Sequence, residues 1–339
     1  MNAPLNRRHF LAASAVMGMG AMASGRIQSG QADTAAETAG VSEEAFTPLP
    51  KALLGRPDEK TLRLVKAAGF DGIEALGKTV VKTSPVDAAE AHLTAERLGM
   101  RIHSVLYGWA NFNSPNAGHV ARDIEQIETA LRACQGFGAD TLLLVPCKIV
   151  AKEMAIPKAW ELDIRFDEKT GPLRQVVAGD NSKYEQYIEA HNVSADASKK
   201  AIARLLPVAE RTGVVIALEN VWNNLWSSPA MFANFVRSFD CHWVQAYLDL
   251  GNHVKYAPTE EWIRALGKLI VKCHVKDFRL NANGQGGRFV NIRDGSVNWP
   301  SVRRELAKVG YEGWMTIEGS GRLSPAEKNK RLDLILSGK

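Results

Sequence analysis

The amino-acid sequence predicts a closed (β/α)8 barrel, the TIM fold, over most of its 339 residues. Strand-like apolar runs alternate with amphipathic helical segments, which favours a parallel sheet with right-handed crossover connections. Eight such units can be traced along the chain, and eight units close into a barrel. The alternative, an open doubly wound sheet, is disfavoured because no glycine-rich dinucleotide fingerprint follows the first strand.

The first four units are recognised from apolar spacing and from glycines. Leu62 and Val65 lie on one face of the first helical segment, as the helical period requires. Gly69 follows that segment, and a glycine at this position can adopt the left-handed conformation that ends a helix. Similar patterns predict strands at 51–54, 71–76, 101–107 and 141–145, and helices at 57–68, 86–98 and 117–136.

The last four units repeat this order after one very long connection. The predicted strands are 214–220, 243–252, 269–278 and 314–320, and the predicted helices are 194–211, 258–266, 299–309 and 325–336. The connection at about 149–194 has roughly 45 residues, well beyond the usual loop length. It is polar and follows the fourth strand, on the face where barrel enzymes carry their active sites. We therefore expect a lid or a dimer contact there.

Residues 1–23 have the features of a twin-arginine signal peptide. Arg7 and Arg8 precede a weakly apolar run, and Ala21 and Ala23 form an A-x-A cleavage site. The run is too short and too rich in glycine and alanine for a permanent membrane span. Residues 24–45 lack apolar periodicity and read as a linker, which leaves 46–339 for the barrel. We expect a protein that is periplasmic or otherwise exported; a disordered basic N-terminus is the alternative.

The composition excludes some classes of function. With 45% apolar and 23% charged residues the chain is typical of globular proteins, and a net charge of +5 is too small to indicate a nucleic-acid partner. Four cysteines lack the pair spacing of a metal site and lie in apolar surroundings, so we expect free core thiols rather than a disulfide. They are Cys134, Cys147, Cys241 and Cys273.

Each of the last four strand-like runs carries a metal-binding side chain near its end. These side chains are Glu219, Asp249, His274 and Glu318. Because the carboxyl ends of barrel strands meet at one face, we expect the four to converge there. Three carboxylates and one imidazole suit Mn²⁺, Mg²⁺ or Co²⁺ better than a thiolate set would. Carboxylates that only cap βα loops are the alternative.

The sequences around these strand ends resemble a known family. ALENVWNN (217–224), YLDLGN (247–252), KCHVKDF (272–278) and TIEGS (316–320) are similar to motifs of the xylose isomerase-like TIM barrel superfamily. Within it, the sugar phosphate isomerase/epimerase branch, which includes the ketose 3-epimerases, is the most similar, and the resemblance extends over about 49–336.

The resemblance implies a mechanism and a ligand set. It implies that Glu219, Asp249, His274 and Glu318 bind one divalent metal ion, and that Glu219 and Glu318 are also the catalytic acid and base. In such enzymes the metal stabilises an enediolate, while one carboxylate removes a proton and the other returns it on the opposite face of the ketose.

Several other polar or aromatic residues are candidates for binding the substrate. Hydroxyl-binding or ring-stacking roles are predicted for His103, Trp109, Asn220, Trp222, Asn252 and Lys276. For the tryptophans the alternative is packing on the barrel rim, and for His103 and Lys276 it is a buried, hydrogen-bonded position in the barrel interior. Glu74 in the second strand fits either interpretation equally well.

Three departures from the ketose 3-epimerase pattern point away from ordinary tagatose or psicose epimerisation. Asn252 stands where those enzymes commonly have His, Leu225 where they have a second Glu, and Leu280 where they have Arg. A further difference is that related sequences have a G-x-G turn before the last helical unit, of which this chain keeps only the second glycine, Gly295.

The sequence thus predicts a metal-dependent sugar isomerase or epimerase that acts on a keto-sugar or sugar derivative through an enediolate. Mn²⁺ is the expected ion, and for assembly the sequence leaves a homodimer open. A lyase or hydrolase acting on 3-keto-glycosides is the main alternative, followed by a non-catalytic sugar-binding protein. A phosphodiester endonuclease is disfavoured, because Asn252 replaces a required His and no D-x-H follows the seventh strand. The sequence leaves the sugar itself open.

Overall fold

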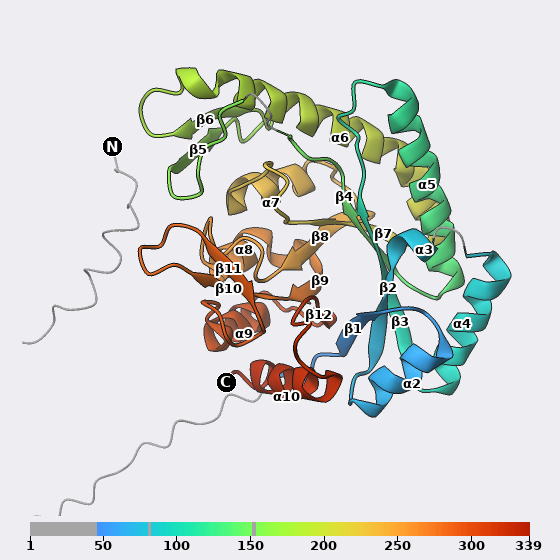
Figure 1. Ribbon diagram of the computed structural model, residues 1–339. Helices are drawn as coiled ribbons and strands as arrows, with labels where there is room; N and C mark the ends of the chain where they lie inside the picture. Colours follow the sequence, from blue (N-terminus) through green and yellow to red (C-terminus); the bar gives the residue numbers. More distant parts are fainter. Residues whose placement is uncertain (1–45, 81–82, 151–153) are drawn as a thin grey trace, which may run out of the picture. The chain divides into compact units, whose positions relative to one another are not determined.

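A computed structural model describes residues 46–80, 83–150 and 154–339. Eight parallel strands close into a barrel in the order β1-β12-β9-β8-β7-β4-β3-β2, which confirms the predicted TIM fold (Figure 1). The barrel strands are β1 (Lys51–Gly55), β2 (Gly72–Leu76), β3 (Arg101–Trp109), β4 (Thr141–Val145), β7 (Val215–Glu219), β8 (Val244–Asp249), β9 (Ile270–Val275) and β12 (Met315–Ile317).

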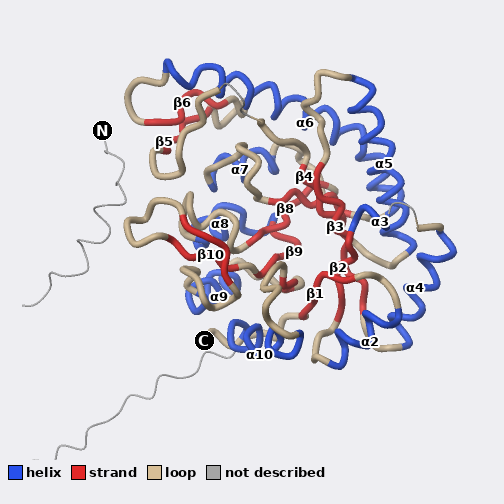
Figure 2. Tube along the Cα trace, in the orientation of Figure 1, coloured by secondary structure: helices blue, strands red, loops and turns tan. Residues whose placement is uncertain are grey.

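Helices connect the strands and lie outside them, as Figure 2 shows. Ser or Asp precedes several helices, and its side chain accepts a hydrogen bond from a backbone N–H of the first turn, as Ser84 and Ser228 do. The helices are α2 (Glu59–Ala67), α3 (Gly77–Val80), α4 (Pro85–Arg97), α5 (Ala117–Gly136), α6 (Glu185–Thr212), α7 (Pro229–Arg237), α8 (Thr259–Leu266), α9 (Trp299–Lys308) and α10 (Pro325–Leu336), with short 3-10 turns at Ser182–Tyr184 and Gly267–Leu269.

The structure differs from the sequence prediction in several elements, among them the short helix α3, which was not predicted. Helix α6 begins at Glu185, nine residues before the predicted start, and α7 was not predicted. Two antiparallel hairpins also lie outside the barrel: β5 (Leu162–Phe166) with β6 (Leu173–Val177), and β10 (Asp277–Leu280) with β11 (Gly287–Val290). The predicted seventh strand is therefore two strands, since the chain leaves the barrel at Lys276 and continues into a hairpin.

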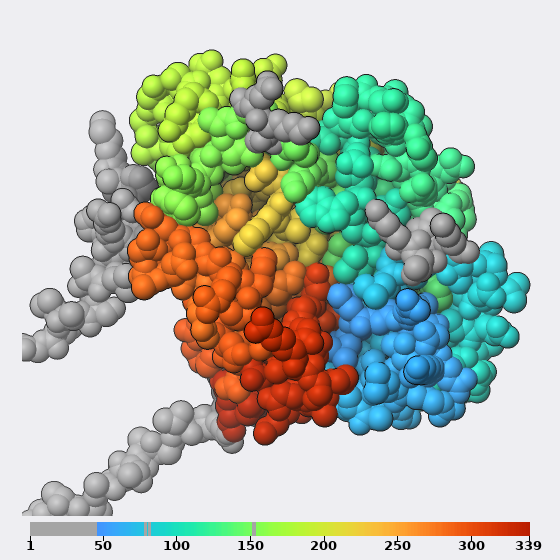
Figure 3. Space-filling model, viewed as in Figure 1, coloured from blue at the N-terminus to red at the C-terminus, as the bar shows by residue number. Residues whose placement is uncertain are grey.

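The insertion after β4 packs against the loop between β7 and α7. The backbone N–H of Ile149 donates to the Asn223 carbonyl at 3.0 Å, and the Asn224 amide donates to the Ile149 carbonyl at 2.9 Å. On the other side, a Cβ atom at Gly286 would lie 3.9 Å from the Trp160 ring, so the two hairpins adjoin, as Figure 3 also shows. The insertion thus lies on the rim that carries the strand ends; its role as a lid or dimer contact stays a prediction.

Other sequence predictions have different outcomes. All four cysteines are free thiols, as predicted. The predicted signal peptide at 1–23 and linker at 24–45 lie outside the described residues. In the part of the chain that the structure describes, no helix combines the length and apolar character that a membrane crossing requires.

His191 gives the fold a testable pH dependence. Its buried ring accepts a hydrogen bond from the Trp226 backbone N–H at 3.3 Å, and burial lowers its pKa to about 4. The unfolded chain takes up this proton near pH 6.5 but the folded chain only near pH 4, so the free energy of unfolding falls as the pH drops through that window.

The free energy of unfolding of the wild type should fall as the pH drops from 7 to 5. In His191→Gln, which keeps a hydrogen-bond acceptor, we expect this fall to be about 2 kcal/mol smaller. Urea unfolding at both pH values measures this difference. His119→Gln, at an exposed position of α5, is the control and should behave as the wild type does. Equal losses in the wild type and His191→Gln would contradict the prediction.

Candidate metal centre

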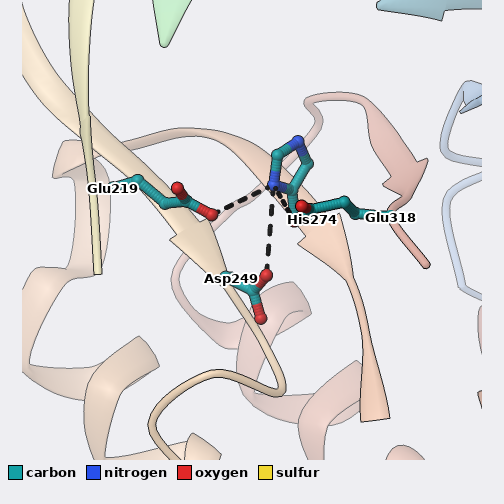
Figure 4. A group of neighbouring side chains, drawn as sticks. All are labelled: Glu219, Asp249, His274 and Glu318. Atoms are coloured by element: carbon teal, nitrogen blue, oxygen red, sulfur yellow. Dashed lines mark hydrogen bonds and ion pairs between the residues drawn. The ribbon is translucent and has the colours of Figure 1, made fainter. Parts of the chain in front are cut away.

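Four neighbouring strands bring the predicted ligands to one end of the barrel. Glu219 and Asp249 are the last residues of β7 and β8, and Asp249 pairs in register with His274 of β9. Glu318 directly follows β12, and its backbone N–H still donates to the Val275 carbonyl of β9. One ligand atom from each of the four lies within 4.8 Å of the others, which confirms the predicted convergence (Figure 4).

The His274 ring lies at the centre of the cluster. Its Nδ1 is 3.0 Å from Glu318 Oε2, 3.3 Å from Glu219 Oε1 and 4.0 Å from Asp249 Oδ2, as the dashed lines in Figure 4 mark. The ring is fully buried, and its other nitrogen, Nε2, lies 2.6 Å from Glu74 Oε2. The imidazole therefore separates one carboxylate in the barrel interior from three at the mouth.

Burial and mutual repulsion perturb the protonation of these groups. Burial, together with Glu318 and Asp249, raises the pKa of Glu219 to about 7 even though His274 opposes the shift. Burial alone would raise the pKa of Glu318, but His274 and Lys276 lower it by more. The pKa of Glu318 therefore lies below its usual value. Burial alone would lower the pKa of His274, but Glu74 and other nearby groups raise it well above its usual value.

Lys276 supplies a second positive charge. Its Nζ lies 2.7 Å from Glu318 Oε2 and 3.1 Å from Asp249 Oδ2, and its side chain is largely buried. Together with His274 it balances part of the negative charge of the cluster.

The loop after β8 holds Asp249 in place. The backbone N–H groups of Gly251 and Asn252 donate to Asp249 Oδ1 at 2.8 and 2.7 Å, which leaves Oδ2 to face the cluster. Gly251 is required because a Cβ atom there would lie 2.5 Å from the Lys276 carbonyl oxygen. The YLDLGN motif thus both provides a candidate ligand and fixes its orientation.

The four residues fit a divalent ion. Asp249 Oδ2 and Glu318 Oε2 are buried oxygens that face the cluster, where Lys276 forms ion pairs with both and His274 Nδ1 lies beside them. Together with Glu219 they offer three carboxylates beside one imidazole nitrogen, a donor set typical of Mn²⁺, Mg²⁺ or Co²⁺ sites.

Two of the predicted substrate-binding residues have other positions or partners. His103 does not lie at the mouth, because it is only the third residue of the nine-residue β3 and is fully buried. Its ring stacks on Trp314, and its Nε2 lies 3.0 Å from Thr316 Oγ1. Both ends of the Asn220 amide bind the backbone of Asp249, at 2.9 and 2.6 Å. His103 thus packs in the barrel interior and Asn220 supports Asp249, and their roles in substrate binding stay predictions.

Asn252 also contacts a candidate ligand. Its Nδ2 donates to Glu219 Oε1 at 3.3 Å, and its Oδ1 accepts from Lys276 Nζ at 3.2 Å. Lys276 and Asn252 therefore lie at the cluster, and Asn252 already binds protein groups on both sides; their roles in substrate binding stay predictions. Leu225, which stands where the ketose 3-epimerase pattern has a second Glu, is buried.

The two tryptophans lie on the rim. Trp109 ends β3 and is 41% exposed, with Lys148 Nζ 5.7 Å from its ring centroid. Trp222 is half-buried, and its indole N–H donates to the Asn252 carbonyl oxygen. Their roles in substrate binding stay predictions.

Phe289, which the sequence analysis missed, lies beside the cluster. It belongs to β11, is 44% exposed, and packs against Trp222 with ring centroids 4.9 Å apart. Lys276 Nζ is 5.4 Å from its ring centroid. The signal was present in the glycine-rich turn between two short strand-like runs, which is typical of a hairpin.

The chain belongs to the xylose isomerase-like TIM barrel family, whose model matches residues 62–334. Among curated proteins it is similar to an uncharacterised protein of Methanocaldococcus jannaschii, with 27% identity over 144 residues, which are 40% of this chain and 47% of that protein. The chain thus matches about half the length of this relative.

Solved structures with the same fold include sugar epimerases. A D-tagatose 3-epimerase-like protein aligns with a TM-score of 0.62 at 16% identity, covering 85% of this chain and 97% of that one. The 3-keto-D-glucoside 4-epimerase of E. coli aligns with a TM-score of 0.61 at 16% identity, covering 85% of this chain and 99% of that one. A xylose isomerase-like TIM barrel protein from Mycobacterium smegmatis in complex with magnesium aligns with a TM-score of 0.58 at 18% identity, covering 88% of this chain and 99% of that one. At these identities the likeness establishes the fold alone.

Proposed function

We propose that the protein is a divalent-metal-dependent sugar isomerase or epimerase that acts on a keto-sugar or sugar derivative through an enediolate. The observation that carries this proposal is the convergence of Glu219, Asp249, His274 and Glu318 at the barrel mouth. Membership of the xylose isomerase-like family and the fold shared with sugar epimerases support it.

The donor set favours one Mn²⁺ ion per chain, with Mg²⁺ or Co²⁺ as alternatives. The magnesium complex of the Mycobacterium smegmatis protein supports a divalent ion in this fold. When bound, such an ion supplies Lewis acidity to the substrate carbonyl and to the hydroxyl oxygen beside it.

Glu318 and Glu219 are the proposed proton-transfer groups. They lie on either side of His274 Nδ1, at 3.0 and 3.3 Å. The Glu318 side chain is 27% exposed and that of Glu219 only 8%, so Glu318 is the better placed to meet a substrate from the mouth. We assign proton removal to Glu318 and proton return on the opposite face to Glu219.

Lys276 is proposed to bind a substrate oxygen on which negative charge develops. Its ammonium already lies among the carboxylates, and three carboxylates with one divalent ion leave one negative charge for it to balance. An ammonium group donates hydrogen bonds to hydroxyl and carbonyl oxygens without accepting any.

Phe289 and Trp222 favour a substrate larger than one free ketose. Their rings form a wall beside Lys276, and the exposed part of Phe289 offers an apolar surface to a second ring. This observation supports a second candidate function, a lyase or hydrolase that acts on 3-keto-glycosides after the same proton removal. The fold shared with a 3-keto-D-glucoside epimerase agrees with either function.

Export and assembly complete the proposal. The twin-arginine sequence around Arg7 and Arg8 supports action in the periplasm or otherwise outside the cytoplasm. A small-molecule carbohydrate is the proposed partner, and a homodimer formed through the insertion at about 149–194 is the proposed assembly.

Glu318→Gln tests the chemistry. Gln keeps the size and one oxygen but cannot accept the proton, so we expect at least 10²-fold slower deuterium uptake from D₂O at the carbon beside the carbonyl of a 3-keto-glucoside. NMR at saturating Mn²⁺ follows the exchange, and the metal content of each sample is measured alongside.

Glu312→Gln, at an exposed position before β12, is the matched control and should exchange as the wild type does. Equal exchange by fully metallated Glu318→Gln would rule this residue out as the base. The same spectra separate the two candidate functions, because an epimerase inverts a carbon whereas a lyase or hydrolase releases the aglycone. A wild-type protein that exchanges no proton with Mn²⁺, Mg²⁺ or Co²⁺ would contradict both.

Phe289→Ala tests the aromatic wall. Removing the ring takes away apolar contact with a second ring of the substrate, so we expect KM to rise about 10-fold or more for an aryl 3-keto-glucoside. The KM for the methyl 3-keto-glucoside should change less than threefold, because this substrate lacks the second ring. Steady-state kinetics with both substrates gives the comparison, and an equal change for both would contradict the wall.

A further inference from the structure

We propose that Glu74 is a positioning residue that fixes His274 for metal binding. This inference rests on the metal dependence proposed above and deepens it, since Glu74 is not one of the four converging residues. The sequence alone could not separate this role from substrate binding.

The geometry sets the direction of the imidazole. Glu74 belongs to β2 and His274 to β9, and β1 and β12 lie between these strands on the shorter path around the barrel. Glu74 therefore reaches across the barrel interior, where its Oε2 lies 2.6 Å from His274 Nε2 and both side chains are fully buried. Because the two ring nitrogens point in different directions, holding Nε2 at Glu74 turns Nδ1 toward the three carboxylates.

A second contact fixes the plane of the same ring. Tyr247 packs against His274 with ring centroids 4.5 Å apart and planes tilted by 51°. Tyr247 thus limits tilting of the ring, whereas Glu74 limits its rotation. Without Glu74, the buried Nε2–H would lose its hydrogen-bond partner, which destabilises this ring orientation and favours another.

A carboxylate beside His274 Nε2 affects both the tautomer and the basicity of the imidazole. A histidine ligand commonly donates its second ring N–H to a carboxylate or carbonyl, which fixes the tautomer and makes the metal-binding nitrogen more basic. Glu74 contacts the nitrogen that faces away from the cluster, so it is not a fifth ligand of the same ion. Among the described residues its Oε1 has no hydrogen-bond partner, so the hydrogen bond to His274 is the one that satisfies this buried carboxylate there.

Mn²⁺ titration calorimetry on Glu74→Leu and Glu74→Gln tests the proposal. We expect the Kd for Mn²⁺ to rise 10–100-fold in Glu74→Leu, and less in Glu74→Gln, which keeps an acceptor but no charge. NMR of the ¹⁵N-histidine-labelled, metal-free protein is the second readout. The His274 Nε2–H proton should be protected from exchange in the wild type and lost in Glu74→Leu.

The matched control is Glu305→Gln. Glu305 is a carboxylate on α9, outside the barrel, where it pairs with Arg264 and Lys308, so its neutralisation should leave the Kd within about twofold of the wild type. If Glu74→Leu does not fold, the Glu74→Gln variant decides by the same measurements.

The outcomes distinguish this inference from the proposed function. Folded Glu74 variants that bind Mn²⁺ as tightly as the wild type and keep the protected proton would overturn the positioning role and leave the proposed function standing. A wild-type protein that binds no Mn²⁺, Mg²⁺ or Co²⁺ would overturn both.

Discussion

Three carboxylates held together in the buried mouth of the barrel are the constraint on which the rest of the site depends. Glu219, Asp249 and Glu318 belong to neighbouring barrel segments whose carboxyl ends meet at one face. Like charges repel strongly where water is scarce, so cationic groups must lie among them. His274 and Lys276 provide that charge in the structure. A divalent ion would balance the carboxylates more completely, because it can contact all of them at once.

The surroundings of the cluster keep its ligands aligned. Asn220 and the backbone N–H of Gly251 hold Asp249, while Asn252 contacts Glu219. The departure of Asn252 from the ketose 3-epimerase pattern thus has a structural meaning, since its amide supports a ligand. Holding ligands from rigid strands and short loops reduces the reorganisation that ion binding requires. The less regular parts of the chain, the insertion and the β10–β11 hairpin, form the rim where a substrate would enter.

The fold and the convergence of the four candidate ligands could be predicted from the sequence because both depend on local patterns. Strand periodicity identifies the strand ends, and strand ends at one face of a barrel must converge. The neighbouring residues could not be assigned in this way. Periodicity identifies the strand that contains His103 but not the partners of its ring, which are Trp314 and Thr316. The partners of Asn220 and Glu74, and the approach of Phe289 to Lys276, depend on contacts between distant segments.

A crystal structure of the protein grown with Mn²⁺, with anomalous diffraction recorded at the manganese edge, tests the metal centre most directly. We expect one anomalous peak about 2.0–2.4 Å from oxygens of Glu219, Asp249 and Glu318 and from His274 Nδ1. Lys276 Nζ should then have moved away from Asp249 Oδ2, which the ion takes as a ligand. A map without a peak among these side chains, and with Lys276 still between Asp249 and Glu318, would contradict the metal centre and the chemistry proposed from it.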